Sequence, residues 1–294
     1  MNQALFDGII QSHQDLFLEN DSNKPSLNYS SDDEIYRTAK GACLKLGFIE
    51  KDAECLGYAW QKMIFETKSL DPSQWPDKAN YFNINSQPSK DAFPVCDRNL
   101  GLYVVAPDAK WIEYLAKQNV PTIQLRFKSD DQKLIESEII KSVEAVKGSQ
   151  SRLFINDHWK LAIKHQAYGV HLGQEDLDIA DINQIRRSGL RLGLSTHGYA
   201  EMIKADEHSP SYIALGAVFP TTLKKMETAP QGIGRLYRYA KLMSHYPLVA
   251  IGGIDESNMS AALKSGVGSA AVVRAVINAE DPALAINRLK ENFN

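Results

Sequence analysis

Polar side chains follow short apolar runs at several places in the second half of the chain. The apolar run 153–155 leads into Asn156 and Asp157, and the later run 170–172 leads into a cluster that contains Asp176. A carboxylate just beyond a strand often caps the next helix. Two carboxylates beyond neighbouring strands can instead hold Mg²⁺, which binds one or two carboxylates together with phosphate oxygens. For Asp176 both interpretations stay open on this spacing alone.

Cationic side chains and glycines follow other apolar runs of the same kind. Arg126 and Lys128 lie in the segment QLRFK, and Lys224 lies in the segment VFPTTLKK. Arginine binds phosphate as a planar fork, and lysine binds it as a point charge. The pair Gly252-Gly253 would let backbone N–H groups approach an anion closely. Together these residues predict a site for phosphate or diphosphate groups, in which the acids act through Mg²⁺.

The elements that must position these side chains alternate regularly from Gly101 onward. Short apolar runs, which we expect to form strands, are separated by longer amphipathic segments, which we expect to form helices. The expected strands cover residues 101–106, 121–127, 152–156, 168–172, 190–196, 211–219, 247–253 and 268–273. Nearly continuous apolar strands, each followed by a helix, indicate a parallel sheet. About eight such units predict an α/β protein with a (β/α)8 TIM barrel, and a doubly wound open sheet is the alternative.

The carboxyl ends of all strands meet at one mouth of such a barrel, so residues far apart in the sequence converge there. Ser195 and Thr196 end the fifth expected strand and would join the site. After the eighth expected strand, Arg274 precedes a helix, whose N-terminus favours negative charge. His171 alternates with apolar neighbours, and we expect it to be a buried histidine with satisfied hydrogen bonds.

The first 99 residues follow a different pattern, and we expect them to form a helical extension with a linker. One helix is predicted to begin after a cap at residues 31–32 and to end at Gly47. A second is predicted over residues 51–65. Residues 69–99 are rich in Pro, Asn, Ser and Asp, which predicts a linker or an extended arm. A helical hairpin of this size cannot bury enough surface alone, so it must dock on the barrel or on a second subunit of a homo-oligomer.

Composition and charge are those of an ordinary globular protein. The chain has 294 residues, of which 44% are hydrophobic and 23% charged, and its formal net charge is -3. These values give no reason to expect nucleic acid or an anionic membrane as a partner. No apolar run approaches the length of a membrane span. The three cysteines lack CxxC spacing and the N-terminus lacks a secretory pattern, so we expect a cytoplasmic location.

The motifs, taken together, resemble the thiamine phosphate synthase family. The similarity rests on QLRFK, FINDHWKLAI, YGVHLGQEDL, LGLSTH, YIALGAVFPTTLK, APQG and VAIGGI, which occur in the family's order. It implies a synthase barrel over residues 100–294, with residues 1–99 as an N-terminal extension. It also implies a transferase that couples a hydroxymethylpyrimidine diphosphate to a thiazole phosphate. The products would be thiamine monophosphate and pyrophosphate, formed in a dissociative displacement assisted by Mg²⁺.

The resemblance also implies roles for individual residues. Asp157 and Asp176 would bind Mg²⁺. The catalytic cations that stabilise the leaving diphosphate would be Arg126, Lys128 and Lys224. The implied substrate contacts are Gln124, Leu125, Arg126, Phe127, Lys128, Asn156, Ser195, Thr221, Thr222, Leu223, Lys224, Gly253, Val273 and Arg274.

Two positions depart from the family pattern, both at the implied thiazole-phosphate pocket. Leu223 stands where the family usually has a threonine before the lysine, and Arg274 stands where it usually has a serine. Two alternatives to a synthase are therefore kept: a thiazole tautomerase-like enzyme and a non-catalytic thiamine-phosphate binder. Residues 36–64 are also similar to the last helices of a hydroxymethylpyrimidine phosphate kinase, which would make the extension a remnant without kinase activity.

Overall fold

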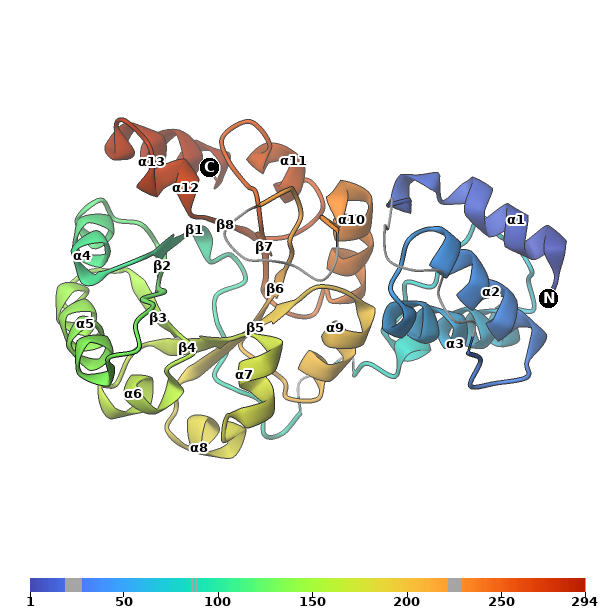
Figure 1. The fold of residues 1–294 in the computed structure, drawn as a ribbon, viewed down its shortest axis with the longest axis horizontal. Helices are drawn as coiled ribbons and strands as arrows, with labels where there is room; N and C mark the ends of the chain where they lie inside the picture. The colour runs from blue at the N-terminus through green and yellow to red at the C-terminus, as the bar shows by residue number, and fades with distance from the viewer. Residues whose placement is uncertain (19–27, 86, 88, 222–228, 294) are drawn as a thin grey trace.

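Eight parallel strands close into a barrel in chain order (Figure 1). The computed structural model describes residues 1–18, 28–85, 87, 89–221 and 229–293. The strands are β1 (Gly101–Ala106), β2 (Thr122–Leu125), β3 (Arg152–Asn156), β4 (Gly169–Leu172), β5 (Arg191–Thr196), β6 (Tyr212–Leu215), β7 (Leu248–Ile251) and β8 (Ser269–Val272). Because β8 pairs with β1, the predicted (β/α)8 TIM barrel is confirmed and the open sheet is wrong.

Helices surround the barrel and connect successive strands (Figure 1). They are α4 (Ala109–Lys117), α5 (Gln132–Ala145), α6 (Trp159–Lys164), α7 (Gln174–Ile179), α8 (Ile182–Arg187), α9 (Tyr199–Asp206), α10 (Gly232–Leu242), α11 (Met259–Leu263), α12 (Arg274–Ile277) and α13 (Pro282–Lys290), with a last turn η3 (Glu291–Phe293). Several begin at an aspartate. The Asp131 carboxylate, for example, accepts hydrogen bonds from the N–H groups of Lys133 and Leu134 and so caps α5.

Three aromatic side chains fill the interior of the barrel. Tyr103, Phe154 and Tyr212 are fully buried there, and the hydroxyls of Tyr103 and Tyr212 lie 2.8 Å apart. The Tyr212 ring fits because the neighbouring strand β5 has Gly193 opposite it. A Cβ at Gly193 would lie 2.2 Å from the ring. This aromatic layer closes the barrel below the mouth, so the interior is a packed core and not a channel.

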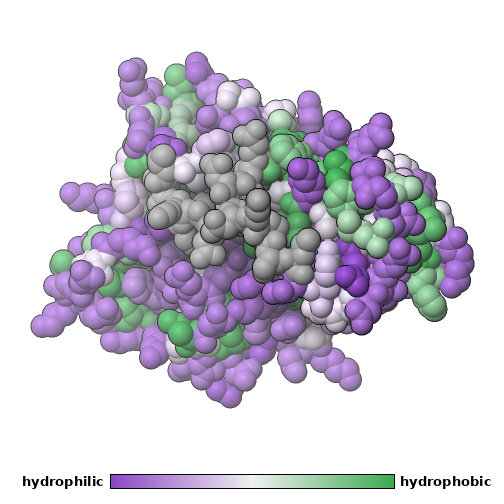
Figure 2. Space-filling model, turned by 45° about the vertical axis from the view of Figure 1, so that its right-hand side comes forward, coloured by the Kyte–Doolittle hydropathy of each residue, from purple (hydrophilic) through white to green (hydrophobic). Residues whose placement is uncertain are grey.

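The described residues of the N-terminal extension form the helices α1 (Gln3–Ser12), α2 (Glu34–Lys45) and α3 (Glu50–Thr67), with a short turn η1 (Gln14–Leu16). The two predicted helices are confirmed as α2 and α3. The cap of α2 is Asp33, whose carboxylate accepts from the Tyr36 N–H at 2.9 Å. Helix α1 is an addition to the prediction. Figure 2 shows the side where the extension meets the barrel, with a mostly hydrophilic surface and small hydrophobic patches.

The last part of the extension, residues 69–99, is an arm that packs against the barrel. Its described residues include the short turn η2 (Ala79–Phe82), and Trp75 and Phe93 are buried. The N–H of Asn85 donates to Asp206 at the end of α9, and the N–H of Phe93 donates to the Ser209 carbonyl. The structure therefore favours the extended arm over a free linker.

The extension docks on α9 and α10 of the same chain. Trp75 Nε1 donates to the Tyr199 hydroxyl at 2.9 Å, and the Phe82 and Tyr199 rings stack. From the barrel, buried Arg235 donates to the carbonyls of Leu16 and Leu46, both at 3.0 Å. One continuous hydrophobic core includes residues of both parts. The division into residues 1–99 and 100–294 stays a prediction.

We expect Arg235→Met to lower the free energy of unfolding by about 3 kcal/mol, because it leaves two buried carbonyls without their charged donor. The measurement is urea unfolding of the full chain. Lys117→Met is the control, since it removes an exposed ion pair with Glu113 and should change stability by less than about 0.5 kcal/mol. A loss below about 1 kcal/mol in Arg235→Met would mean that Arg235 does not hold the two parts together.

Candidate active site

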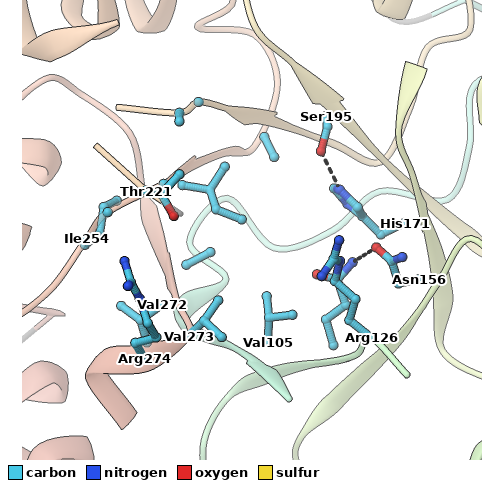
Figure 3. A pocket seen from close by; sticks show the side chains of 18 of the residues that line it. Val105, Arg126, Asn156, His171, Ser195, Thr221, Ile254, Val272, Val273 and Arg274 are labelled. Atoms are coloured by element: carbon cyan, nitrogen blue, oxygen red, sulfur yellow. Dashed lines mark hydrogen bonds between the residues drawn. The ribbon is translucent and has the colours of Figure 1, made fainter. Parts of the chain in front are cut away.

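A cavity of about 850 Å³ opens at the carboxyl ends of the barrel strands (Figure 3). The predicted site residues that line it are Gln124, Arg126, Lys128, Asn156, Asp157, Asp176, Ser195, Thr221, Gly253, Val273 and Arg274. Leu125 and Phe127 do not line it: Leu125 is buried in the main core, and Phe127 packs against that core. The predictions for Thr222, Leu223 and Lys224 lie outside the described residues.

The side chains after β2 and β3 gather on one side of the cavity. Gln124 Nε2 donates to Asn156 Oδ1 at 3.1 Å, which fixes the orientation of both amides. The Arg126 N–H donates to the Ala106 carbonyl at 2.8 Å, so the backbone past β2 stays tied to β1. Figure 3 shows the Arg126 guanidinium beside Asn156. This half of the cavity thus presents a cation and two amides to a ligand.

Asp157 and Asp176 form a carboxylate pair next to this cation cluster. Lys128 Nζ lies 3.0 Å from Asp157 Oδ2. Burial and the negative charge of Asp157 raise the pKa of Asp176 above its usual range. Asp176 is not the N-cap of α7, which is Gly173; it lies in the first turn, where its carboxylate accepts a hydrogen bond from the Gly173 N–H. Two carboxylates that repel each other at a cavity wall suit a divalent cation.

Further ligands for such a cation would have to come from water or substrate. Among the described residues, no cluster of three or more His, Cys, Asp or Glu side chains could hold a metal ion.

Ser195 is held in place by hydrogen bonds to two neighbouring groups. Its hydroxyl lies 2.8 Å from His171 Nε2, and its carbonyl accepts from Gln174 Nε2 at 2.7 Å. His171 Nδ1 lies 2.7 Å from the Tyr212 hydroxyl, so the aromatic layer orients the imidazole. The prediction of a buried, satisfied His171 is confirmed, and the residue also lines the cavity.

The opposite half of the cavity is built from β6, β7 and β8. Gly252 and Gly253 have φ of +100° and +65°, and a Cβ at Gly253 would lie 2.6 Å from the Pro220 carbonyl oxygen. Only glycine fits this turn, so it brings the backbone close to a ligand. Figure 3 shows Arg274 projecting from the start of α12 into the same half as Thr221.

Sequence reasoning missed part of the cavity wall. The additional polar lining residues include His171, Glu175, His197 and Asn278. His197 Nδ1 lies 2.7 Å from Glu201 Oε2. A signal existed for both His197 and Glu175: His197 directly follows β5, and Glu175 lies three residues past the end of β4. Asn278 lies beyond α12, and nothing in its local sequence points to the cavity.

The fold and the cavity define a (β/α)8-barrel enzyme that binds phosphorylated substrates. The model of the family described as thiamine monophosphate synthase matches residues 92–276. The thiamine-phosphate synthase of Escherichia coli O157:H7 is 50% identical over 199 residues, which are 68% of this chain and 94% of that protein. The enzyme of the same description from Shigella boydii serotype 18 is 49% identical over the same shares. The chain belongs to the thiamine monophosphate synthase family.

A solved structure supports the same assignment. Thiamine phosphate pyrophosphorylase from Pyrococcus furiosus superposes with a TM-score of 0.60 at 27% identity, and the match covers 67% of this chain and 96% of that chain. Residues 1–91, which contain α1, α2 and α3 of the extension, lie before the region that the family model matches.

Proposed function

We propose that the protein condenses 4-amino-2-methyl-5-(diphosphooxymethyl)pyrimidine with 4-methyl-5-(2-phosphoethyl)thiazole to thiamine monophosphate and pyrophosphate. With the carboxylated form of the thiazole, the carboxyl group would leave as CO2 in addition. The observation that carries this proposal is the division of one cavity into two halves (Figure 3). Arg126, Asn156 and the carboxylate pair suit a diphosphate with a metal ion. The tight turn at Gly253, with Arg274, suits a second phosphate group. Two phosphorylated substrates can therefore meet in the same space.

The reaction needs stabilisation of a leaving group more than it needs a protein nucleophile. The bond from the pyrimidine methylene carbon to the diphosphate oxygen breaks, and the thiazole nitrogen supplies the electron pair of the new C–N bond. Pyrophosphate leaves with the electrons of the broken bond. Arg126 and Lys128 put positive charge where negative charge develops, in a cavity that orients them beforehand. Lys224, outside the described residues, stays a predicted third cation.

Asp157 and Asp176 are the residues that would hold Mg²⁺. They fit because both are hard oxygen donors in mutual contact. Burial and, after it, the negative charge of Asp157 raise the pKa of Asp176, and a bound cation would relieve the repulsion between the two carboxylates. When bound, Mg²⁺ would neutralise charge on the departing diphosphate. Asp157 also orients Lys128 through the 3.0 Å contact, so the metal and the cation would face the same ligand.

We place this chemistry in the cytoplasm, with the two small-molecule substrates as partners. The three cysteines, all among the described residues, form no disulfide, which suits a reducing compartment. No helix in the described part of the chain has the length and apolar character needed to cross a membrane. The net charge of -3 gives no attraction to nucleic acid. A homo-oligomer stays a prediction.

An assay with both substrates and Mg²⁺ tests the proposal. Thiamine monophosphate and pyrophosphate should appear together. A tautomerase would isomerise the carboxylated thiazole phosphate without consuming the pyrimidine diphosphate, and a binder would retain thiamine monophosphate without turnover. Either of those results would reject the synthase.

Arg274→Ser should raise KM for the thiazole phosphate about tenfold, because it removes a charge-assisted contact to that phosphate. KM for the pyrimidine diphosphate should stay within about twofold, since that substrate lies in the other half of the cavity. Arg288→Ser is the matched control: Arg288 is half-exposed on α13 beside Glu256, outside the cavity. An unchanged thiazole-phosphate KM would leave Arg274 without a role in binding.

A further inference from the structure

Helix α9 follows strand β5, whose last residues line the cavity, and it begins without a side-chain cap from its own N-cap residue. Its N-cap residue is Gly198, which offers no side-chain acceptor to the exposed N–H groups of the first turn. Helices normally satisfy these groups with a Ser, Thr, Asp or Asn at this position. The lack is notable because the preceding residues Ser195, Thr196 and His197 all line the cavity.

The missing cap comes from the N-terminal extension. Asp52, on α3, accepts a hydrogen bond from the Ala200 N–H at 2.9 Å and a second from the Tyr199 N–H. The carboxylate occupies the space of an absent side chain: a Cβ at Gly198 would lie 2.0 Å from Asp52 Oδ2. Asp52 is 2% exposed, so it makes this contact from inside the interface. Asp52, which lies 148 positions before Ala200 in the chain, thus caps α9 in the way that an N-cap aspartate would.

The surroundings of Asp52 favour this role. Burial raises its pKa to about 6, with the Arg235 guanidinium and the two backbone N–H groups acting in the opposite direction. At pH 8 the carboxylate is therefore ionised, and a negative charge at a helix N-terminus is stabilising. Tyr199, the first residue of α9, is also held by the extension, through Trp75, Phe48 and Phe82.

We propose that Asp52 is a positioning residue for the active site: by capping α9 from the extension, it holds the turn after β5, which carries His197 into the cavity and directly follows the strand end with Ser195. Glu201 supports the same turn from within α9, since its carboxylate accepts from the His197 N–H at 2.8 Å. The extension then contributes to the geometry of the active site. This inference rests on the proposed function for its kinetic readout.

The effect should fall on one substrate. Ser195 lies beside His171, in the half of the cavity that contains Asn156 and Arg126 (Figure 3). We therefore expect Asp52→Ala to raise KM for the pyrimidine diphosphate about tenfold, a size typical of slightly misplaced site groups, and to leave KM for the thiazole phosphate within about twofold. Asp52→Asn keeps one acceptor oxygen and should raise the first KM about threefold.

A rescue variant separates positioning from general stability. Asp52→Ala/Gly198→Asp moves the carboxylate to the N-cap itself, and the extended backbone at Gly198, with φ of -179°, accepts any residue. This double variant should return KM for the pyrimidine diphosphate to within about threefold of wild type. Asp33→Ala is the matched control. It removes the carboxylate that caps α2 in the same extension and should lower Tm without changing either KM.

The full chain is used in steady-state kinetics with each substrate varied, together with thermal unfolding and calorimetric titration of Mg²⁺ and pyrophosphate. Weaker pyrophosphate binding in Asp52→Ala than in wild type would support the positioning role of Asp52, whether or not the enzyme turns over. If wild type formed no thiamine monophosphate, that result would reject the proposed function but not the positioning role. The proposal is overturned if Asp52→Ala, folded by its thermal unfolding, shows both KM values and the pyrophosphate affinity of wild type. It is also overturned if a folded double variant keeps the raised KM.

Discussion

Asp157→Ala and Asp176→Ala should each lower kcat about 1000-fold, the largest change we expect from a single substitution. Each variant loses one of the two carboxylates that would hold Mg²⁺ against the departing diphosphate. A metal clamp of this kind contributes several kcal/mol of transition-state stabilisation, and each 1.36 kcal/mol is about tenfold in rate. Steady-state assays at saturating substrates measure the loss. Asp178→Ala is the control. Asp178 lies on α7 together with Asp176, but its side chain is exposed and pairs with Lys204 of α9.

Thermal unfolding gives a second readout for the same variants. Mg²⁺ with pyrophosphate should raise the Tm of wild type and of Asp178→Ala, but not of the two site variants. Because the pKa of Asp176 is raised, the metal must displace a proton held more tightly than usual. Affinity for Mg²⁺ should therefore rise with pH over the range in which Asp176 ionises. Normal turnover of both site variants without Mg²⁺ would remove the metal from the mechanism.

Arg126→Met should lower kcat/KM for the pyrimidine diphosphate about 100-fold. The substitution keeps the length of the side chain but removes the guanidinium, whose charge-assisted hydrogen bonds to a phosphate contribute about 3 kcal/mol. KM for the thiazole phosphate should stay within about twofold, which is the reverse of the pattern expected for Arg274→Ser. If Arg126→Met weakened both substrates equally, the assignment of the two cavity halves would be contradicted.

The barrel and most of the catalytic wall are predictable from the sequence, for a physical reason. Strands buried on both faces must be apolar, so β3 and β4 are visible as runs that end where polar residues begin. Asn156 ends β3, Asp157 follows it directly, and Asp176 lies four residues past the end of β4; the closed topology then brings them together. No tertiary information is needed beyond the count of units.

Element boundaries are less predictable, because tertiary contacts decide them. The apolar run 211–219 is predicted as one strand, but β6 ends at Leu215. Past that residue the Val218 N–H donates to the Ile251 carbonyl, so the chain bonds to the end of β7 outside the regular register. Of the residues after Leu215, Gly216 and Ala217 line the cavity, whereas Val218 is buried in the main core. Hydrophobicity alone does not distinguish residues that continue a strand from residues that form the loop after it.

Helix α1 shows a signal that is present but weak. Asn2 caps it by accepting from the Leu5 N–H at 3.1 Å, and Leu5 and Ile9 share its buried face. A helix this short is marginal without tertiary packing, so its pattern predicts little by itself. The contact between Asp52 and α9 has no local signal, because its acceptor and donors lie in separate parts of the chain.

The most direct test of the account is a crystal structure of the full chain with Mn²⁺, in place of Mg²⁺, and pyrophosphate. Anomalous scattering locates the manganese without ambiguity. The account predicts one ion bound to carboxylate oxygens of both Asp157 and Asp176 and to oxygens of pyrophosphate, with Arg126 in contact with the same ligand. An ion bound elsewhere, or pyrophosphate bound on the side of Gly253 and Arg274 with no ion at the carboxylate pair, would contradict it.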